Sequence, residues 1–360
     1  MGLPKTEIIF RELADTAIAR SSRGAVALLL DDATAADTLT TYGRASDIDA
    51  TKWTADNAAL IKLAFASGAA KVLAQRVTKA ESVVTWATEI DALVPMKWSW
   101  LAAPSADAAG MAAIATKLKA LRADGKTYKA VVANPTTPSD CEGVVDYAQT
   151  GTVTSDCMGT SKAMTAAQYT VRLAGLFAGL ALDRSATGYE LTDISALTVD
   201  STPGTSIDAG KLVIVYSGET YEIARAVTSL TTTDETHPKL FKKIKHVEGC
   251  DMMAADLDEI WRKRYRGKKV NSYDSKQALV ADCIAYLDGI SGTVLSPDYD
   301  NTAYVDTDAQ NAWLMSNGTD TTSMSDNEVA QANTEDQVFI KLDTQLIDAM
   351  EDVSMSIVLE

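Results

Sequence analysis

The sequence predicts an α/β fold, with a mainly parallel sheet and crossover helices over residues 21–238, followed by an α+β C-terminal part. Two observations lead to this prediction. Short apolar runs alternate with segments of helical apolar spacing from Gly24 onward, and this alternation changes character after Gly188. The chain has 360 residues, of which 46% are hydrophobic and 23% charged, a globular composition long enough for two or three domains.

The elements of the first part follow from the spacing of its apolar residues. Buried strands are predicted at residues 24–30, 71–77, 98–103 and 129–133. Helices are predicted between and after them at residues 54–67, 82–93 and 107–122. Because a strand, helix, strand order joins parallel strands, this succession favours a parallel sheet. Residues 165–182 are apolar nearly all round, which predicts a buried helix packed closely through Gly175 and Gly179.

Beyond Gly188 the segments are shorter. Residues 191–199, 211–217 and 220–226 predict a small antiparallel patch, with Gly218 at the bend of the last pair. In the C-terminal part, strands are predicted at residues 241–247, 338–342 and 345–348. Helices are predicted at residues 251–266, 274–290 and 325–331, and Gly267 and Gly292 act as helix stops. The remainder of residues 296–336 is rich in Asp, Asn, Thr and Ser.

Both ends of the chain carry apolar residues that no further element of the sequence covers. These residues are Val353, Met355, Ile357 and Leu359 at the C-terminus and Ile8 and Phe10 at the N-terminus. A strand with a free edge and an uncovered apolar face aggregates unless another strand pairs with it. We therefore interpret both ends as arms that insert beside a neighbour's strand containing Val338, Ile340 and Leu342. An ordinary edge strand of the first domain remains the alternative for the N-terminal stretch.

Charge is distributed unevenly along the chain. The net charge of −16, from 33 Lys and Arg against 49 Asp and Glu, argues against a nucleic-acid partner. Residues 239–269 carry 10 basic and 5 acidic residues, a net of +5, whereas residues 274–360 carry 17 acidic residues and 2 lysines, a net of −15. The basic segment has two explanations. Cations near a helix C-terminus gain about 0.3–1 kcal/mol each from its dipole, or the cluster contacts an acidic protein surface.

The sequence offers few reactive groups. Its histidines, His237 and His246, belong to no recognisable Ser or Cys nucleophile motif, and no G-x-S-x-G elbow occurs. Residues 120–127 resemble a phosphate loop but lack its first glycine and follow a helix instead of a strand. Residues 298–303 begin like a calcium loop but lack its turn glycine and its final glutamate. We therefore assign no catalytic residue, no cofactor and no metal.

Cysteine usage and hydropathy predict a soluble protein of a reducing cytoplasm. The four cysteines, at positions 141, 157, 250 and 283, have no short metal-type spacing and are too sparse for a disulfide scaffold. The longest apolar stretches, residues 25–30 and 174–182, are shorter than the roughly 20 residues needed to cross a bilayer. The N-terminus lacks the apolar run of a signal peptide.

Segments spread over the whole chain carry a family resemblance. They are residues 2–4, 8–10, 20–28, 184–187, 208–212, 224–231, 241–245, 292–295 and 347–352. In their order and spacing they resemble the tail sheath proteins of contractile phage tails, in the shorter form of Gram-positive myophages and R-type bacteriocins. The sequence departs from the family at Ala226-Val227-Thr228, where Gly-Val-Asn is expected. This departure affects only the conformation of that turn.

The resemblance implies a subunit of a helical sheath, built from stacked hexameric rings around an inner tube, that contracts and drives the tube through a target envelope. It implies an N-terminal arm at residues 1–20, an outer α/β domain at 21–238, an inner domain at 239–352 and a C-terminal arm at 353–360. Arm strands of neighbouring subunits complete one sheet. The residues that we then assign to contact with the tube are Lys242, Lys245, Arg262, Lys263 and Arg266.

The same resemblance implies the partners and the place of the protein. Besides further copies of itself, these partners are the inner tail tube protein and the baseplate and tail terminator proteins, without nucleic acid or membrane insertion. The particle is a virion tail or a bacteriocin, assembled in the cytoplasm of the host bacterium. An α/β hydrolase-like enzyme is the alternative, although likeness of fold carries no activity. The inner tube protein is a third candidate, but such subunits are shorter and mainly β.

Overall fold

The computed structural model describes residues 24–36, 38–77, 84–159 and 161–358. Contacts between residues divide the chain into two compact units. Unit 1 consists of Met1–Glu248 together with Glu351–Glu360, and unit 2 consists of Gly249–Met350. The predicted division into two arms, an outer domain and an inner domain stays a prediction.

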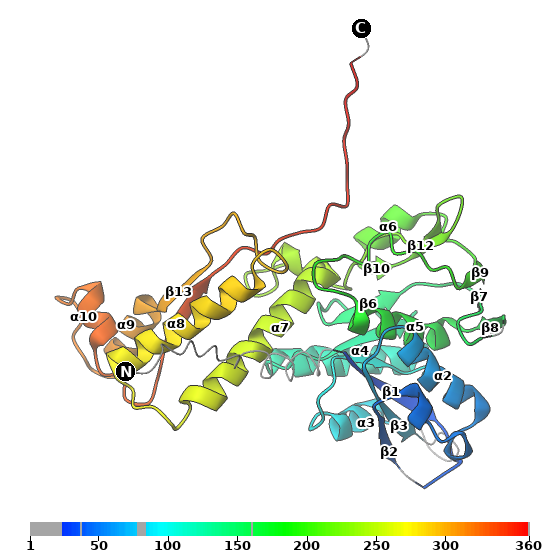
Figure 1. The fold of residues 1–360 in the computed structure, drawn as a ribbon, viewed down its shortest axis with the longest axis horizontal. Coiled ribbons are helices and arrows are strands. Elements are labelled where there is room, and N and C mark those ends of the chain that lie inside the picture. Colours follow the sequence, from blue (N-terminus) through cyan, green and yellow to red (C-terminus); the bar gives the residue numbers. More distant parts are fainter. Residues whose placement is uncertain (1–23, 37, 78–83, 160, 359–360) are drawn as a thin grey trace, which may run out of the picture. The chain divides into compact units, whose positions relative to one another are not determined.

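A seven-stranded sheet forms the centre of unit 1, with strand order β10-β6-β5-β4-β1-β3-β2 (Figure 1). Its strands are β1 (Ala25–Asp31), β2 (Leu39–Tyr42), β3 (Lys71–Val77), β4 (Trp100–Ala102), β5 (Lys129–Ala133), β6 (Val144–Tyr147) and β10 (Lys211–Leu212). Neighbouring strands run parallel except β2, which is antiparallel to β3. The prediction of a mainly parallel sheet is confirmed. The interior strand β1 pairs with both β3 and β4, and Val26 lies opposite Val72 and Trp100.

Unit 1 contains the helices α2 (Ala55–Ala66), α3 (Trp86–Leu93), α4 (Ala108–Ala123), α5 (Ala166–Gly179) and the short α6 (Pro203–Asp208). Three of these helices, α2, α4 and α5, begin at a side chain that caps free backbone amides. The side chains of Thr54, Asp107 and Thr165 each accept a hydrogen bond from the backbone three residues further on. The long helices therefore start within a few residues of their predicted positions.

Helix α5 is buried nearly all round, as predicted, and its glycines permit a close backbone approach. A Cβ added at Gly179 would lie 2.5 Å from the carbonyl oxygen of Gly68, and one added at Gly175 would lie 2.8 Å from that of Ala64. Since Ala64 belongs to α2, the two small residues are what lets α5 pack directly against α2.

Two small antiparallel sheets complete unit 1. One contains β7 (Val153–Ser155), β8 (Lys162–Met164) and β9 (Ile194–Ala196), and the other contains β11 (Ile214–Tyr216) and β12 (Tyr221–Ile223). The predicted hairpin at residues 211–226 is present, and Gly218 adopts a φ of 102° at its bend. The strand predicted at residues 191–199 is shorter and pairs with β7.

Unit 2 is built from helices and a two-stranded sheet. Its elements are the C-terminal part of α7 (Ile244–Ile260), a π-helical turn at Trp261–Tyr265, α8 (Tyr273–Ile290), β13 (Thr302–Val305), α9 (Thr307–Ser316), α10 (Asp326–Gln331) and β14 (Ile340–Asp343). Its core joins α8 to β13 and the end of the π-helical turn through Tyr265, Leu279, Cys283 and Val305. Sequence analysis missed β13 and α9, which lie in the polar stretch of residues 296–336.

Two predicted strands are wrong. Residues 241–247 form the end of a 3-10 turn and the first turn of α7, because Ile244 and Val247 are three residues apart and are buried on one helical face. Residues 345–348 contribute only an isolated bridge between Leu295 and Leu346. The amide of Gln345 instead donates to the side chain of Asn301, at 3.0 Å, so no ladder continues there.

Candidate functional site

The two-stranded sheet of unit 2 has one apolar face. In β14 the exposure alternates, with Ile340 and Leu342 partly buried and Lys341 and Asp343 exposed. Ile340 and Leu342 pack against the core cluster formed with α8, and Ala303 of β13 lies opposite Leu342 in the same cluster. The sheet therefore rests with one face on helix α8.

The outer edge of β14 is open in the part of the chain that the structure describes. The amide of Asp306 donates to the carbonyl oxygen of Phe339 at 3.0 Å, and this pair continues the β13–β14 register. In an antiparallel ladder, hydrogen-bonded and non-hydrogen-bonded pairs alternate. The backbone groups of Lys341 therefore face β13, whereas those of Ile340 and Leu342 point away from it. No third strand pairs with β14 among the described residues.

The three residues predicted as the acceptor strand occupy this region. Ile340 and Leu342 belong to β14, and Val338 precedes the strand by two residues. Val338 lines a hollow of about 460 Å³ whose apolar wall also includes Trp261, Tyr265 and Leu279. Their role as an acceptor for another chain stays a prediction.

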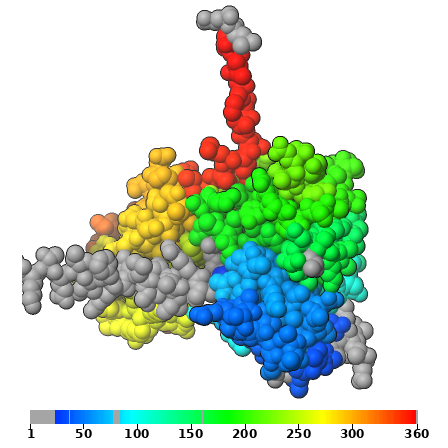
Figure 2. All heavy atoms as spheres, turned by 45° about the vertical axis from the view of Figure 1, so that its right-hand side comes forward, coloured from blue at the N-terminus to red at the C-terminus, as the bar shows by residue number. Residues whose placement is uncertain are grey.

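The C-terminal segment is uncovered. The exposed fractions of Val353, Met355 and Ile357 are 77%, 80% and 82%. Residues 353–358 form no strand and pair with no other described residue of the chain, and Figures 1 and 2 show them in red as a bare, extended segment. Leu359, Ile8 and Phe10 lie outside the described residues. An apolar segment without cover in its own subunit is what the arm hypothesis requires.

The two residues before this segment are held by unit 1. The carboxylate of Glu351 accepts hydrogen bonds from Ser185 and Thr187 and forms an ion pair with Lys243. Burial alone would raise the pKa of this carboxyl, but these three partners outweigh burial and lower it. Sequence analysis missed Glu351. Its hydroxyl partners are 164 and 166 residues away, so no local pattern marks it.

The basic residues at the end of α7 have local acidic partners. Arg262 forms an ion pair with Asp258 at 2.8 Å and Lys263 with Glu259 at 2.5 Å, each one helical turn back. Among the described residues Arg266 has no ion-pair partner. Helix-surface pairs of this kind contribute about 0.3–0.5 kcal/mol each and partly neutralise the cluster.

The five residues predicted to contact a tube are divided between the two units. Lys242 and Lys245 lie in unit 1, at the 3-10 turn and the first turn of α7, whereas Arg262, Lys263 and Arg266 lie in unit 2. Their common role stays a prediction. Nearby Arg264 forms an ion pair with Asp282 of α8 at 3.2 Å, so this cation is directed toward α8.

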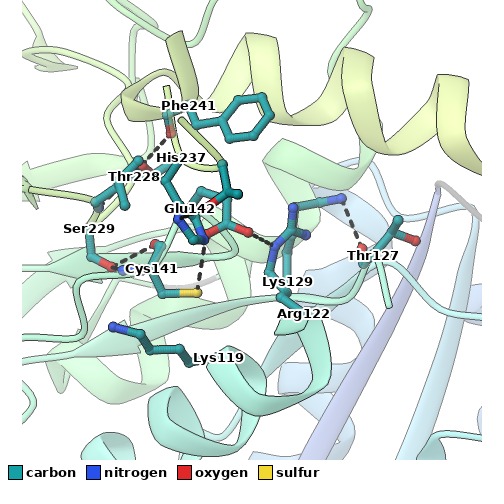
Figure 3. A network of polar contacts seen from close by, with 12 residues as sticks. Lys119, Arg122, Thr127, Lys129, Cys141, Glu142, Thr228, Ser229, His237 and Phe241 are labelled. Atoms are coloured by element: carbon teal, nitrogen blue, oxygen red, sulfur yellow. Dashed lines mark hydrogen bonds and ion pairs between the residues drawn. The ribbon is translucent and has the colours of Figure 1, made fainter. Parts of the chain in front are cut away.

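The residues that an enzyme would use are placed in structural roles. Figure 3 shows Arg122 and Glu142 paired beside Cys141, whose backbone amide and carbonyl both bond to the hydroxyl of Ser229. Burial, together with the charge of Glu142, raises the pKa of the Cys141 thiol to about 12, which keeps it protonated and a poor nucleophile.

Neither histidine is arranged as a general base. His237 bonds to Asp234 and Thr236 within one exposed turn. His246 is only 2% exposed, and its Nδ1 atom lies 3.2 Å from the carbonyl oxygen of Leu240, so a substrate cannot reach it. The described residues contain no group of three or more His, Cys, Asp or Glu side chains suited to a metal. They also contain no helix with the length and hydropathy of a membrane span.

Comparisons with known proteins agree along the whole chain. Residues 236–360 match the family described as phage tail sheath C-terminal domain. The tail sheath protein of Clostridium phage phiCD119 is 28% identical over 366 residues, covering 99% of both chains.

Two solved structures have the same fold. The sheath tail protein of Desulfitobacterium hafniense is 17% identical, with a TM-score of 0.66 over 85% of this chain and 94% of that chain. The anti-feeding prophage helical sheath in the contracted state is 13% identical, with a TM-score of 0.69 over 100% of both chains. Residues 236–360 thus match the phage tail sheath C-terminal domain, and the whole chain is similar in sequence to a tail sheath protein and in fold to solved sheath structures.

Proposed function

We propose that this chain is the structural subunit of a contractile tail sheath, and that its subunits are linked by strand exchange at the open edge of β14. The observation that carries the linkage is a complementarity between two parts of one chain. Among the described residues, no strand pairs with the outward-facing backbone groups of β14, and none covers the apolar side chains of residues 353–358. Each supplies what the other lacks.

The chemistry of this linkage is β-augmentation. An arm strand beside β14 pairs with the backbone groups of Ile340 and Leu342 and places alternate side chains on the apolar face. Backbone hydrogen bonds supply affinity, and the alternation of apolar and polar residues from Val353 onward sets the register. The N-terminal residues Ile8 and Phe10 are proposed to add to the same sheet.

Contraction is then a property of the lattice. The subunits form hexameric rings stacked helically around a tube, and they rotate while the exchanged strands stay paired. The extended lattice converts to a better-packed one, and the free energy released over many subunits drives the tube through a target envelope. Interfaces with two packing arrangements take the place of an active site.

The remaining partners follow from the same proposal. The baseplate, the tail terminator and the inner tube bind the sheath at its ends and along its inner surface. The five basic residues named above are proposed to face an acidic tube. The particle is the tail of a virion or a related contractile particle, and it assembles in the host cytoplasm.

Electron microscopy of the purified chain tests this function. We expect rings or long helical tubes at sufficient concentration, formed without nucleotide or metal. Polymers that need ATP or are abolished by a chelator would contradict the proposal, and so would a particle that stays monodisperse at every concentration. In that last case the hydrolase alternative gains support, and hydrolysis of ester and peptide substrates should then be assayed.

A further inference from the structure

We propose that Glu351 is a positioning residue that attaches the C-terminal arm, residues 353–360, to unit 1. Force carried by the arm then enters unit 1 at this one buried side chain. The inference rests on the proposed function, because it takes residues 353–360 to be a linking arm. It adds a residue and a mechanical role that the arm hypothesis alone does not contain.

The first observation is the burial of a single side chain in an exposed segment. The Glu351 side chain is only 6% exposed, whereas Met350 is fully exposed and the side chain of Asp352 is 79% exposed. A carboxylate buried to this degree is costly unless it is paired and hydrogen-bonded. The segment is therefore fastened at residue 351 and is uncovered from residue 353 onward.

The second observation is the set of groups around this carboxylate. The hydroxyls of Ser185 and Thr187 each donate to Oε1 at 2.8 Å. On the other side, Oε2 lies 3.2 Å from the Lys243 ammonium and 3.6 Å from the Arg225 guanidinium. The side chain of Glu351 is thus bound by three separate segments of unit 1, which contain Ser185 and Thr187, Arg225, and Lys243.

The residues around Glu351 are also held by further hydrogen bonds. The Thr187 hydroxyl also accepts a hydrogen bond from the amide of Ala226 at 3.0 Å, which joins two of the three gripping segments. The Arg225 guanidinium donates to both oxygens of Asp352, at 2.7 and 2.9 Å. Asp352 therefore reinforces the grip from an exposed position, where its contribution is smaller.

The third observation concerns the path of the chain. The chain leaves unit 1 after Glu248 and returns at Glu351. Lys243, five residues before the exit, forms the ion pair with the first residue after the return. The exit and the return are thereby tied together within unit 1. Tension on the arm is passed to unit 1 at Glu351 and does not run back through residues 249–350.

The test compares Glu351→Gln with two controls in the full-length chain. Glu351→Gln keeps the shape but removes the charge that Lys243 and Arg225 face. Glu219→Gln makes the same charge change at an exposed site of unit 1. Val145→Ala opens a small cavity in the buried core of unit 1, so it lowers the melting temperature without touching the grip.

We expect Glu351→Gln to raise the critical concentration for tube formation roughly tenfold or more, as loss of a charged hydrogen-bonded contact does. Val145→Ala should lower the melting temperature at least as much and leave the critical concentration within about twofold, and Glu219→Gln should change neither. Glu351→Asp, which keeps the charge, should recover part of the assembly. Circular dichroism establishes folding, and sedimentation with electron microscopy gives the critical concentration.

Distinct results overturn the two proposals. If the unsubstituted chain forms no polymer, the sheath function itself fails. If it polymerises and Glu351→Gln polymerises equally well, the rooting role fails and the function stands. The rooting role also fails if Val145→Ala impairs assembly as strongly, because the effect is then one of general stability. Should Glu351→Gln not fold, Ser185→Ala removes one of the two hydroxyl donors and is read in the same way.

Discussion

The central sheet of unit 1 and the small sheet of unit 2 differ in how deeply their strands are buried and in how completely the strands are paired. In β1 every residue from Ala25 to Leu30 is buried, and the strand has a partner on both sides. In β14 exposed and partly buried residues alternate, and one edge lacks a partner among the described residues. The strand β1 is thus fully paired within its own sheet, whereas β14 has an open edge among the described residues.

The difference separates the part of the chain that supplies stability from the part that we propose to bind a neighbour. A two-stranded sheet is marginal alone and needs helix packing or further strands. In unit 2, helix α8 packs against the two-stranded sheet. We propose that the further strands come from neighbouring subunits, so that the sheet is completed only on assembly.

The largest expected effect comes from removing the arms. Deletion of residues 353–360, or of residues 1–14, should abolish polymer formation and leave a folded subunit, because all seven strands of the buried sheet lie between residues 25 and 212. Circular dichroism measures folding, and sedimentation with electron microscopy measures assembly. A truncated chain that still forms normal tubes would remove the linking role from that segment. One that unfolds would show that the strand pairs within its own subunit.

A substitution in the buried core should lower the stability of the subunit, in contrast to the arm deletions. Leu28→Ala in β1 removes a fully buried side chain and should lower the free energy of unfolding by about 2–5 kcal/mol. Leu342→Ala in β14, where the side chain is only partly buried, should cost less. Denaturant titration of both variants measures the contrast. Equal losses would show that the small sheet is as self-contained as the large one.

A proline in β14 distinguishes the contribution of an outward backbone hydrogen bond to assembly from that of the apolar side chain. The amide of Ile340 points away from β13, so Ile340→Pro removes an outward donor without breaking the ladder inside the subunit. Ile340→Ala is the matched control, since it loses a similar apolar area and keeps the donor. We expect the critical concentration of the proline variant to exceed that of the alanine variant by roughly tenfold. Equal values would mean that this edge accepts no strand.

The contacts of the Glu351 carboxylate predict that the stability of the subunit depends on pH. The pKa of Glu351 is lowered below its ordinary value of 4.5, so its contribution to stability is fully present above pH 4.5 and is lost as the pH falls through the folded-state pKa. The charged groups that face it, Lys243, Arg225 and Asp352, include one other acid. The pKa of Asp352 is also lowered, by its hydrogen bond and ion pair with Arg225.

Thermal melting between about pH 6 and pH 3 measures this dependence, with an expected contribution on the order of 1 kcal/mol. Asp352→Asn removes the titration of the neighbouring acid and should keep most of the loss of stability at low pH. Glu351→Gln should reduce this loss, and the remainder comes from other carboxylates with a lowered pKa, such as Asp234 and Glu328. An acid loss that is unchanged in Glu351→Gln would show that other carboxylates are responsible.

The smallest effect is expected at the basic cluster. Reversing Arg262, Lys263 and Arg266 to Glu should weaken association with the tube several-fold at low salt and leave the fold intact, because exposed charges are screened over about 10 Å at 0.1 M salt. Co-sedimentation of sheath and tube at two salt concentrations measures it. Tube binding that is unchanged and insensitive to salt would reduce the cluster to a solvated helix surface.

Four neighbouring strands of the large sheet, β1, β3, β4 and β5, and the main helices could be predicted from the sequence, whereas β2 and β6 were missed and β10 was assigned to the small antiparallel patch. Apolar spacing marks β1, β3 and β5 to within a residue, and capping side chains such as Thr54 and Asp107 mark the helix starts. These signals are local, since each depends on residues within one or two turns of the chain. The uncovered apolar residues of the C-terminus were visible in the same way.

The pairing of β14 and the contacts of Glu351 depend on the tertiary structure. The partner of β14 is β13, in a polar stretch without a clear apolar period, so no local pattern indicates the pairing or its free edge. The strand predicted at residues 241–247 became the start of α7, because packing selected the helical face of Ile244 and Val247. Glu351 meets Ser185 and Thr187 across more than 160 residues. Such a contact exists only once both segments are folded, because the buried pocket that it fills is made by the fold itself.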